Sequence, residues 1–99
     1  MAIMTVRLLP AINEHLERLA EDTGIPKASL ILFAIHHICL HNMPVALPDN
    51  VSAPSVRFSL RMPDHVKKNV VEHAKAREMS TNTFINAAIF HVSTVWWNK

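Results

Sequence analysis

The sequence has one cysteine, one glycine and little net charge, and each scarcity excludes a class of protein. Because Cys39 has no second cysteine to pair with, an internal disulfide is impossible, and the chain suits a reducing cytosol. One glycine beside six prolines argues against a low-complexity or disordered protein. A net charge of +2 excludes a strongly basic tail, so any affinity for nucleic acid must come from arginine and lysine concentrated locally.

Long apolar runs are also missing. The richest run, residues 30–40, is interrupted by His36 and His37, and it is far shorter than the roughly 20 residues of a membrane span. The N-terminal residues lack the charged and apolar regions of a signal peptide. We therefore expect a cytoplasmic protein with no membrane partner. Apolar residues still make up 49% of the 99 residues, which is enough for a packed core.

What the sequence does contain is an internal repeat with an offset of 54 residues. The segment Met-Thr-Val-Arg-Leu at 4–8 returns as Phe-Ser-Leu-Arg-Met at 58–62. The apolar positions that follow return at the same offset, so that Leu16, for example, matches Val70. A repeat of this kind indicates that each half builds one supersecondary unit whose apolar face the other half covers.

In the first copy, the sequence predicts one short strand and two helices. Alternation of side-chain type predicts a strand over residues 3–8, and apolar spacing predicts helices over 11–22 and 26–41. Pro10 is suited to the first position of a helix, and Gly24 tolerates the left-handed conformation that commonly ends one.

The second copy repeats this order. It predicts a strand over 57–62, a helix over 64–77 and a final helix over 81–95, with Ser80 as a favourable N-cap. Glu78 stands where the first copy has glycine, and a left-handed cap is sterically costly for such a side chain, so the sequence does not define this helix end.

The chain therefore divides into two units that share one core. The first unit covers residues 1–41 and the second covers 56–99. The linker between them, residues 42–55, contains three prolines and little periodicity. Fully extended, it spans about 45 Å, which allows the second strand to return beside the first.

Two isolated short strands are unstable, but they can pair antiparallel as a β-ribbon above the helices. The inner face would then carry Met4, Val6, Leu8, Phe58, Leu60 and Met62. The outer face would carry Ile3, Thr5, Arg7, Arg57, Ser59 and Arg61. A two-stranded ribbon fits the major groove of DNA, where arginine bonds guanine, hydroxyl groups bond several base edges and isoleucine contacts a thymine methyl. The six outer residues are the predicted base contacts.

The start of each second helix is a predicted phosphate contact, because free backbone N–H groups and the helix dipole favour anions there. In the second copy this site consists of small polar residues, namely Ser80, Thr81 and Asn82. In the first copy it consists of Lys27 and Ala28, which follow a proline. We expect the two halves to grip the DNA backbone unequally.

With this order of elements, and with Arg-Phe-Ser-Leu-Arg-Met-Pro at 57–63, the chain resembles the ribbon-helix-helix superfamily of the Arc and Met repressors. The resemblance covers about residues 2–41 and 56–95. Because one chain carries both halves, it also resembles the tandem ribbon-helix-helix proteins of conjugative plasmids. The resemblance implies a mostly α fold in which two short antiparallel strands form a ribbon packed on four helices, a single-chain pseudo-dimer. It further implies base contacts by Arg57, Ser59 and Arg61, and phosphate contacts by Ser80, Thr81 and Asn82.

The expected function is sequence-specific binding of double-stranded DNA, as a transcriptional repressor or a plasmid or phage accessory factor. The alternative is a protein-interaction module on the same fold, such as an antitoxin, an inhibitor or a scaffold. Apolar residues beyond one core stripe leave self-association along DNA open as well; they are Leu32, Phe33, Leu40, Trp96 and Trp97.

Catalytic and metal sites are not expected. His37 and His41 stand four residues apart, a spacing compatible with zinc or nickel, but Cys39 points away from that helix face. No nucleophile with a matching base and no pair of carboxylates converge in the sequence, so we expect neither an enzyme nor a cofactor.

Overall fold

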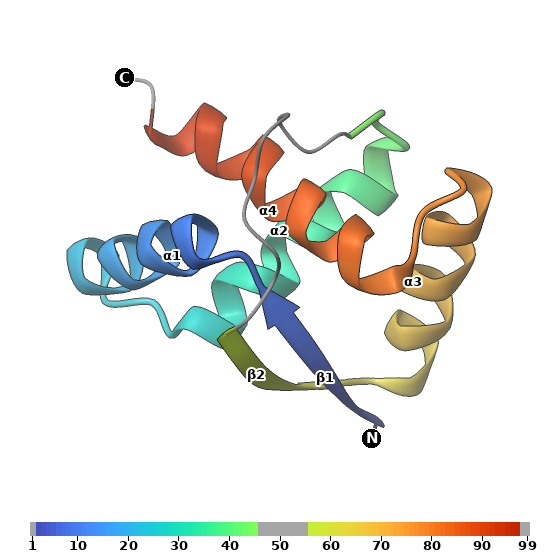
Figure 1. The fold of residues 1–99 in the computed structure, drawn as a ribbon, viewed down its shortest axis with the longest axis horizontal. Helices are drawn as coiled ribbons and strands as arrows, with labels where there is room; N and C mark the ends of the chain where they lie inside the picture. Colours follow the sequence, from blue (N-terminus) through green and yellow to red (C-terminus); the bar gives the residue numbers. More distant parts are fainter. Residues whose placement is uncertain (1, 46–55, 98–99) are drawn as a thin grey trace.

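The computed structural model describes the backbone of residues 2–45 and 56–97 and the side chains up to residue 92. Strand, helix, helix occurs twice along the chain (Figure 1), as β1 (Ala2–Leu8), α1 (Pro10–Thr23), α2 (Lys27–His41), β2 (Val56–Met62), α3 (Asp64–Ala76) and α4 (Thr81–Trp97). The predicted mostly helical fold with two paired strands is confirmed. The observed elements begin or end within two residues of the predicted bounds.

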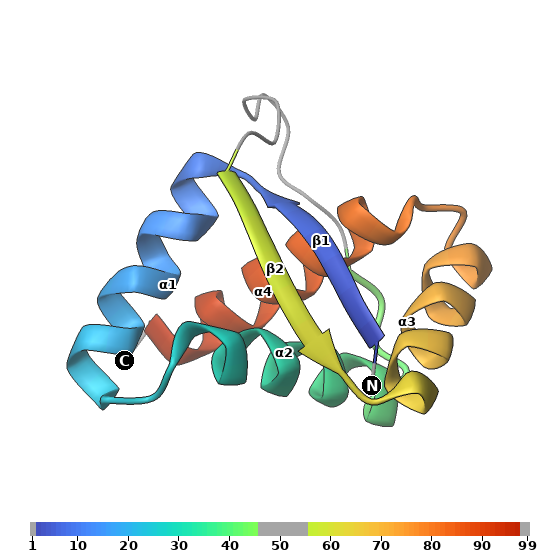
Figure 2. The ribbon, with the colours of Figure 1, turned by 90° about the horizontal axis from the view of Figure 1, so that it is seen from below.

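The two strands lie side by side as an antiparallel ribbon (Figure 2). The register places Thr5 opposite Ser59 at the centre, so the repeat is related to itself by an approximate two-fold axis at this pair. Both strands have the same alternation of exposure, and the predicted inner face is confirmed. Its buried residues are Val6, Leu8, Leu60 and Met62, and its half-buried residues are Met4 and Phe58.

Beneath the ribbon, α2 and α4 pack against each other. Helices α1 and α3 lie on opposite sides of the ribbon (Figure 2). The described buried side chains form one cluster drawn from both copies of the repeat. The centre of this cluster comes from α2 and α4, which contribute residues such as Ile31, Ile35, Phe84, Ile85 and Ile89. One copy, with a single strand and two helices, could not bury this surface alone. The two copies therefore form one core.

Within residues 2–45 and 56–97, three helix ends adopt the left-handed conformation. Gly24 has φ +73°, as predicted, and its N–H bonds the carbonyl of Ala20. Asn42 and Glu78 have φ +47° and +56°, and each lies in a pair of backbone hydrogen bonds that closes the helix in a Schellman motif. The backbone bonds therefore impose on Glu78 the conformation that its side chain disfavours.

The start of α4 follows the prediction. The Ser80 hydroxyl accepts a hydrogen bond from the Thr83 N–H at 3.1 Å, so Ser80 caps the helix. The first residues of the predicted linker belong to the packed structure, because Val45 is buried and Met43 is half-buried. The remaining linker residues, 46–55, lie outside the described residues.

None of the helices within the described residues is by itself both long and apolar enough to cross a membrane. By length and composition, α1 and α2 pass only as a pair bent by 109°.

Candidate nucleic-acid interface

The six residues predicted to contact bases lie together on the outward face of the ribbon, and all six are exposed. We call them the outward face. Its cross-strand pairs are Ile3 with Arg61, Thr5 with Ser59, and Arg7 with Arg57. One end of the ribbon therefore presents two guanidinium groups, and the other presents one guanidinium group beside an aliphatic side chain.

The backbone hydrogen bonds show how close these pairs are. The N–H of Arg7 donates to the Asn82 side chain at 2.7 Å, and its carbonyl accepts from the Asn86 side chain at 2.9 Å. Both groups thus point away from β2, which makes Arg7 and Arg57 a non-hydrogen-bonded pair. Cα atoms in such pairs are about 4.5 Å apart, and alternate residues share this geometry. The three outward pairs are the closely spaced ones.

The arginines of the outward face have no carboxylate beside them among the described residues. No described residue forms an ion pair with Arg7, Arg57 or Arg61, whereas Arg18 on α1 lies 3.8 Å from the Glu14 carboxylate. Like charges directly opposite each other destabilise a strand pair. The outward face therefore carries an arginine pair that weakens the ribbon and that is turned toward solvent.

Two asparagines of α4 complete the hydrogen bonding of the outer edge of β1. Asn82 Oδ1 accepts from the Arg7 N–H, and Asn86 Oδ1 accepts from the Leu9 N–H at 2.9 Å. Asn86 is fully buried, and its amide nitrogen donates to the carbonyls of Arg7 and Asn82. Asn86 is the site-positioning residue that the sequence analysis missed.

A signal for Asn86 is present in the repeat. The counterpart of Leu9 is Pro63, and the counterpart of Asn86 is Leu32. Proline has no N–H, so the second copy needs no acceptor at this point and a leucine can take the place of the asparagine. Comparison of the two copies could have predicted this hydrogen bond.

At the start of α2, the Lys27 amine bonds the Asn13 side chain and lies 5.1 Å from the centre of the Phe58 ring. This arrangement holds the ammonium group beside the ribbon rather than letting it extend into solvent. Ala28 follows and offers only its backbone N–H. The structure thus places both residues at the start of α2, as predicted, with the Lys27 ammonium beside the ribbon.

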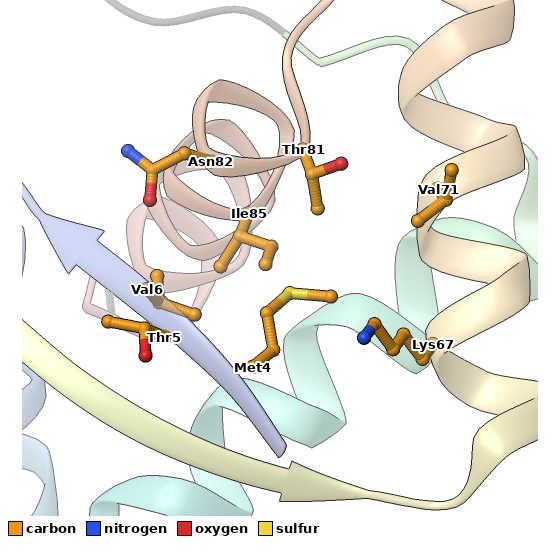
Figure 3. Close-up of a pocket in the computed structure, with 8 residues that line it drawn as sticks. All are labelled: Met4, Thr5, Val6, Lys67, Val71, Thr81, Asn82 and Ile85. Atoms are coloured by element: carbon orange, nitrogen blue, oxygen red, sulfur yellow. The ribbon is translucent and has the colours of Figure 1, made fainter. Parts of the chain in front are cut away.

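At the start of α4, the three predicted phosphate contacts have different surroundings. The Ser80 hydroxyl is used in the helix cap, and the Asn82 oxygen is used by the Arg7 N–H. Figure 3 shows Asn82 beside β1 and Thr81 facing the space between α3 and α4. Of the three side chains, Thr81 is therefore the best placed to contact another molecule.

Arg77 is a second residue that the sequence analysis missed. Its guanidinium group lies 5.2 Å from the centre of the buried Phe84 ring and donates hydrogen bonds to the carbonyls of His73 and Met43. It joins the end of α3 to the segment after α2, so its role is in the fold and it lies away from the outward face. The repeat gives no signal for it, because its counterpart is Thr23.

The histidine pair and the cysteine do not combine into a metal centre among the described residues. The rings of His37 and His41 lie 4.8 Å apart on α2. Burial raises the pKa of the Cys39 thiol, and the charge of Arg77 lowers that pKa by a smaller amount. The thiol therefore stays protonated at neutral pH and is a poor metal ligand or nucleophile.

No protein-family model matches this chain, and no curated protein or solved structure is significantly similar to it. The geometry of the ribbon and the internal repeat are therefore the basis for assigning a function.

Proposed function

We propose that this chain is a tandem ribbon-helix-helix protein that binds double-stranded DNA by inserting its ribbon into the major groove. The order of elements, the antiparallel pairing and the single core drawn from both copies support the fold assignment. The outward face supports the ligand assignment, because its exposed groups suit base edges.

The observation that carries the proposal is the close pair of Arg7 and Arg57. This pair costs the isolated protein stability, and no described carboxylate offsets the repulsion. An anionic partner converts the repulsion into attraction, and guanine supplies two acceptors to each guanidinium group. The pair thus favours DNA over a neutral protein partner.

The outward face is asymmetric, and we infer an asymmetric operator. Two arginines face one end of the site, where paired guanines are favoured. At the other end Ile3 lies opposite Arg61, a combination that favours a thymine methyl beside a guanine. A single chain has no strict two-fold axis that would require equal half-sites.

Backbone contacts come from the starts of α2 and α4 in this proposal. Lys27 supplies charge at one start, while Thr81 and free backbone N–H groups supply hydrogen bonds at the other. These contacts fix the register of the ribbon without selecting sequence. In the cell such a protein acts as a cytoplasmic repressor or as an accessory factor of a plasmid or phage.

The test is selection from a random pool of duplex DNA, followed by affinity measurements at several salt concentrations. Arg61→Ala should cost about 1–3 kcal/mol at one base position and relax the preference there. Lys27→Met should weaken binding to all sequences alike and lower the salt slope by about 1.

The matched control is Arg18→Ala, which removes an exposed arginine that lies on α1 beside Glu14 and is not part of the outward face. This control should leave the base preference unchanged. If Arg61→Ala changes affinity no more than the control does, the outward face does not contact bases and the proposal is wrong.

Exposed apolar residues on α2 favour a second, protein partner. Phe33 is 56% exposed and Leu40 is 69% exposed, and both belong to α2, the helix with the highest share of apolar residues.

The partner that fits the proposed function is a second copy of this chain, bound at an adjacent site on the DNA. Sedimentation with and without DNA tests it: Leu40→Ser should reduce the number of chains bound at adjacent sites, and one chain per DNA at every concentration would contradict it.

A further inference from the structure

An open cavity of about 310 Å³ lies between β1, the first half of α3 and the start of α4 (Figure 3). Its inner wall is apolar and consists of Met4, Val6, Val71 and Ile85. Ile85 and Val6 belong to the packed core beneath it, whereas Met4 is half-buried and Val71 on α3 is 43% exposed. The volume is at the lower limit of typical small-molecule sites.

The rim of the cavity is polar and carries one positive charge. Lys67 comes from α3, Thr81 and Asn82 from α4, and Thr5 from the ribbon. None of the described residues that line the cavity is a carboxylate. A ligand with an apolar body and an anionic group matches this combination, because the body removes apolar surface from water while the anion lies beside the ammonium and hydroxyl groups.

The other side of the ribbon, between β2, α1 and α2, shows what fills the equivalent space. At an offset of 54 residues, Met4 corresponds to Phe58, Thr81 to Lys27 and Lys67 to Asn13. There, the Lys27 ammonium of α2 lies over the ring of Phe58 of β2 and bonds the Asn13 side chain of α1.

The chain thus provides its own aromatic ring at one of two equivalent places. At the other place it provides a flexible methionine and leaves a cavity.

We propose that this cavity binds a small organic anion, with a ring-sized apolar body against Met4 and Val71 and a carboxylate beside Lys67 and Thr81. The cavity shares Thr5 with the outward face and Thr81 with the proposed phosphate contacts, but the proposal does not depend on DNA binding. Its test uses the complete chain without DNA, so its failure and the failure of the proposed function are distinguishable.

The probe is indole-3-acetate, and the neutral comparison is indole-3-acetamide, which has the same ring without the charge. Titration is followed by the NMR shifts of the Val71 and Ile85 methyl groups. The acid should give saturable shifts of these methyls, and the amide should bind about fivefold more weakly because it lacks the ion pair.

Two variants test the two parts of the site. Lys67→Met keeps the apolar stem and should weaken the acid about fivefold while leaving the amide unchanged. Lys68→Met is the matched control, since Lys68 is the next residue of α3 and does not line the cavity; it should change neither affinity. Met4→Phe introduces the ring that its counterpart Phe58 provides and should weaken the acid and the amide alike, with the melting temperature measured to show that the variant folds.

Several results would overturn the proposal. Equal affinity of the acid for the Lys67→Met and Lys68→Met variants would show that the ammonium group is not used. Equal shifts of the same methyls with inorganic phosphate would reduce the cavity to a nonspecific anion contact. Absence of saturable methyl shifts with the acid at millimolar concentration would exclude this ligand class.

Discussion

The two copies of the repeat fold alike but satisfy the edges of the ribbon with different chemistry. The outer edge of β1 bonds two asparagine side chains of α4. Directly after β2, where the counterpart of Leu9 lies, the chain has Pro63, which has no N–H, and the counterpart of Asn86 is Leu32. The difference teaches that one missing donor just after a strand allows a buried polar residue in the facing helix to become apolar.

The copies also differ in side-chain filling around the ribbon. On one side of the ribbon Lys27 contacts Phe58 and Asn13, whereas on the other side their counterparts Thr81, Met4 and Lys67 line a cavity. The two copies of the repeat therefore have the same backbone fold, while the side chains on the two sides of the ribbon make different contacts. We expect Asn86, the left-handed helix ends and the arginine pair to respond separately to substitution.

The largest effect is expected at Asn86. Asn86→Leu makes the second helix of the second copy resemble that of the first, but it leaves the Leu9 N–H and the Arg7 carbonyl without their bonds. Loss of these buried bonds should lower the free energy of unfolding by about 2–4 kcal/mol, as measured by urea denaturation.

A double-mutant cycle gives this prediction its control. Leu9 has φ −64°, which suits proline, so Leu9→Pro removes the donor without backbone strain. In the Leu9→Pro background, Asn86→Leu should cost less than it does alone, because one of the two groups no longer needs a partner. Equal costs in both backgrounds would show that the hydrogen bond to Leu9 contributes nothing.

A smaller effect is expected at the left-handed helix ends. Glu78→Gly relieves the strain of a side chain at φ +56° and should raise the free energy of unfolding by about 1 kcal/mol. Gly24→Ala should lower it by about 1 kcal/mol, since a Cβ atom there meets nothing within 4 Å and only backbone strain acts. Changes of the same sign in the two variants, measured by thermal melting, would contradict this comparison.

The smallest effect on stability is expected at the arginine pair. Arg57→Thr removes the like charge opposite Arg7 and should raise the free energy of unfolding by about 0.5 kcal/mol at low salt. The gain should shrink as salt screens the repulsion. Arg18→Thr is the control, and it should show no gain because Arg18 lies beside Glu14. Arg57→Thr, unlike this control, should also weaken DNA binding.

Much of the fold follows from the sequence because periodicity is a local property. The alternation over residues 3–8 and the spacing of Leu16, Ile35 and Val70 each identify a buried face, and the structure confirms them. The exposure of the outward face follows from the same alternation, since residues two apart in a strand share a side.

The rest depends on contacts between distant parts of the chain. The register that puts Arg7 opposite Arg57, and not opposite its repeat partner Arg61, follows from antiparallel pairing about Thr5 and Ser59. The bond of Asn86 to Leu9 joins residues 77 positions apart, and local propensity contains no information on it. Arg77 likewise contacts Met43 through tertiary packing that no periodicity predicts.

Interference by guanine methylation tests the central claim most directly. Methylation at guanine N7 blocks the major-groove acceptor that arginine uses. In the experiment, the selected duplex is methylated before the protein is added. Methylation of guanines inside the site should abolish binding by the unaltered protein, and one of these guanines should lose its effect with Arg61→Ala. If the protein binds methylated and unmethylated duplexes equally, the ribbon does not enter the major groove and the account is wrong.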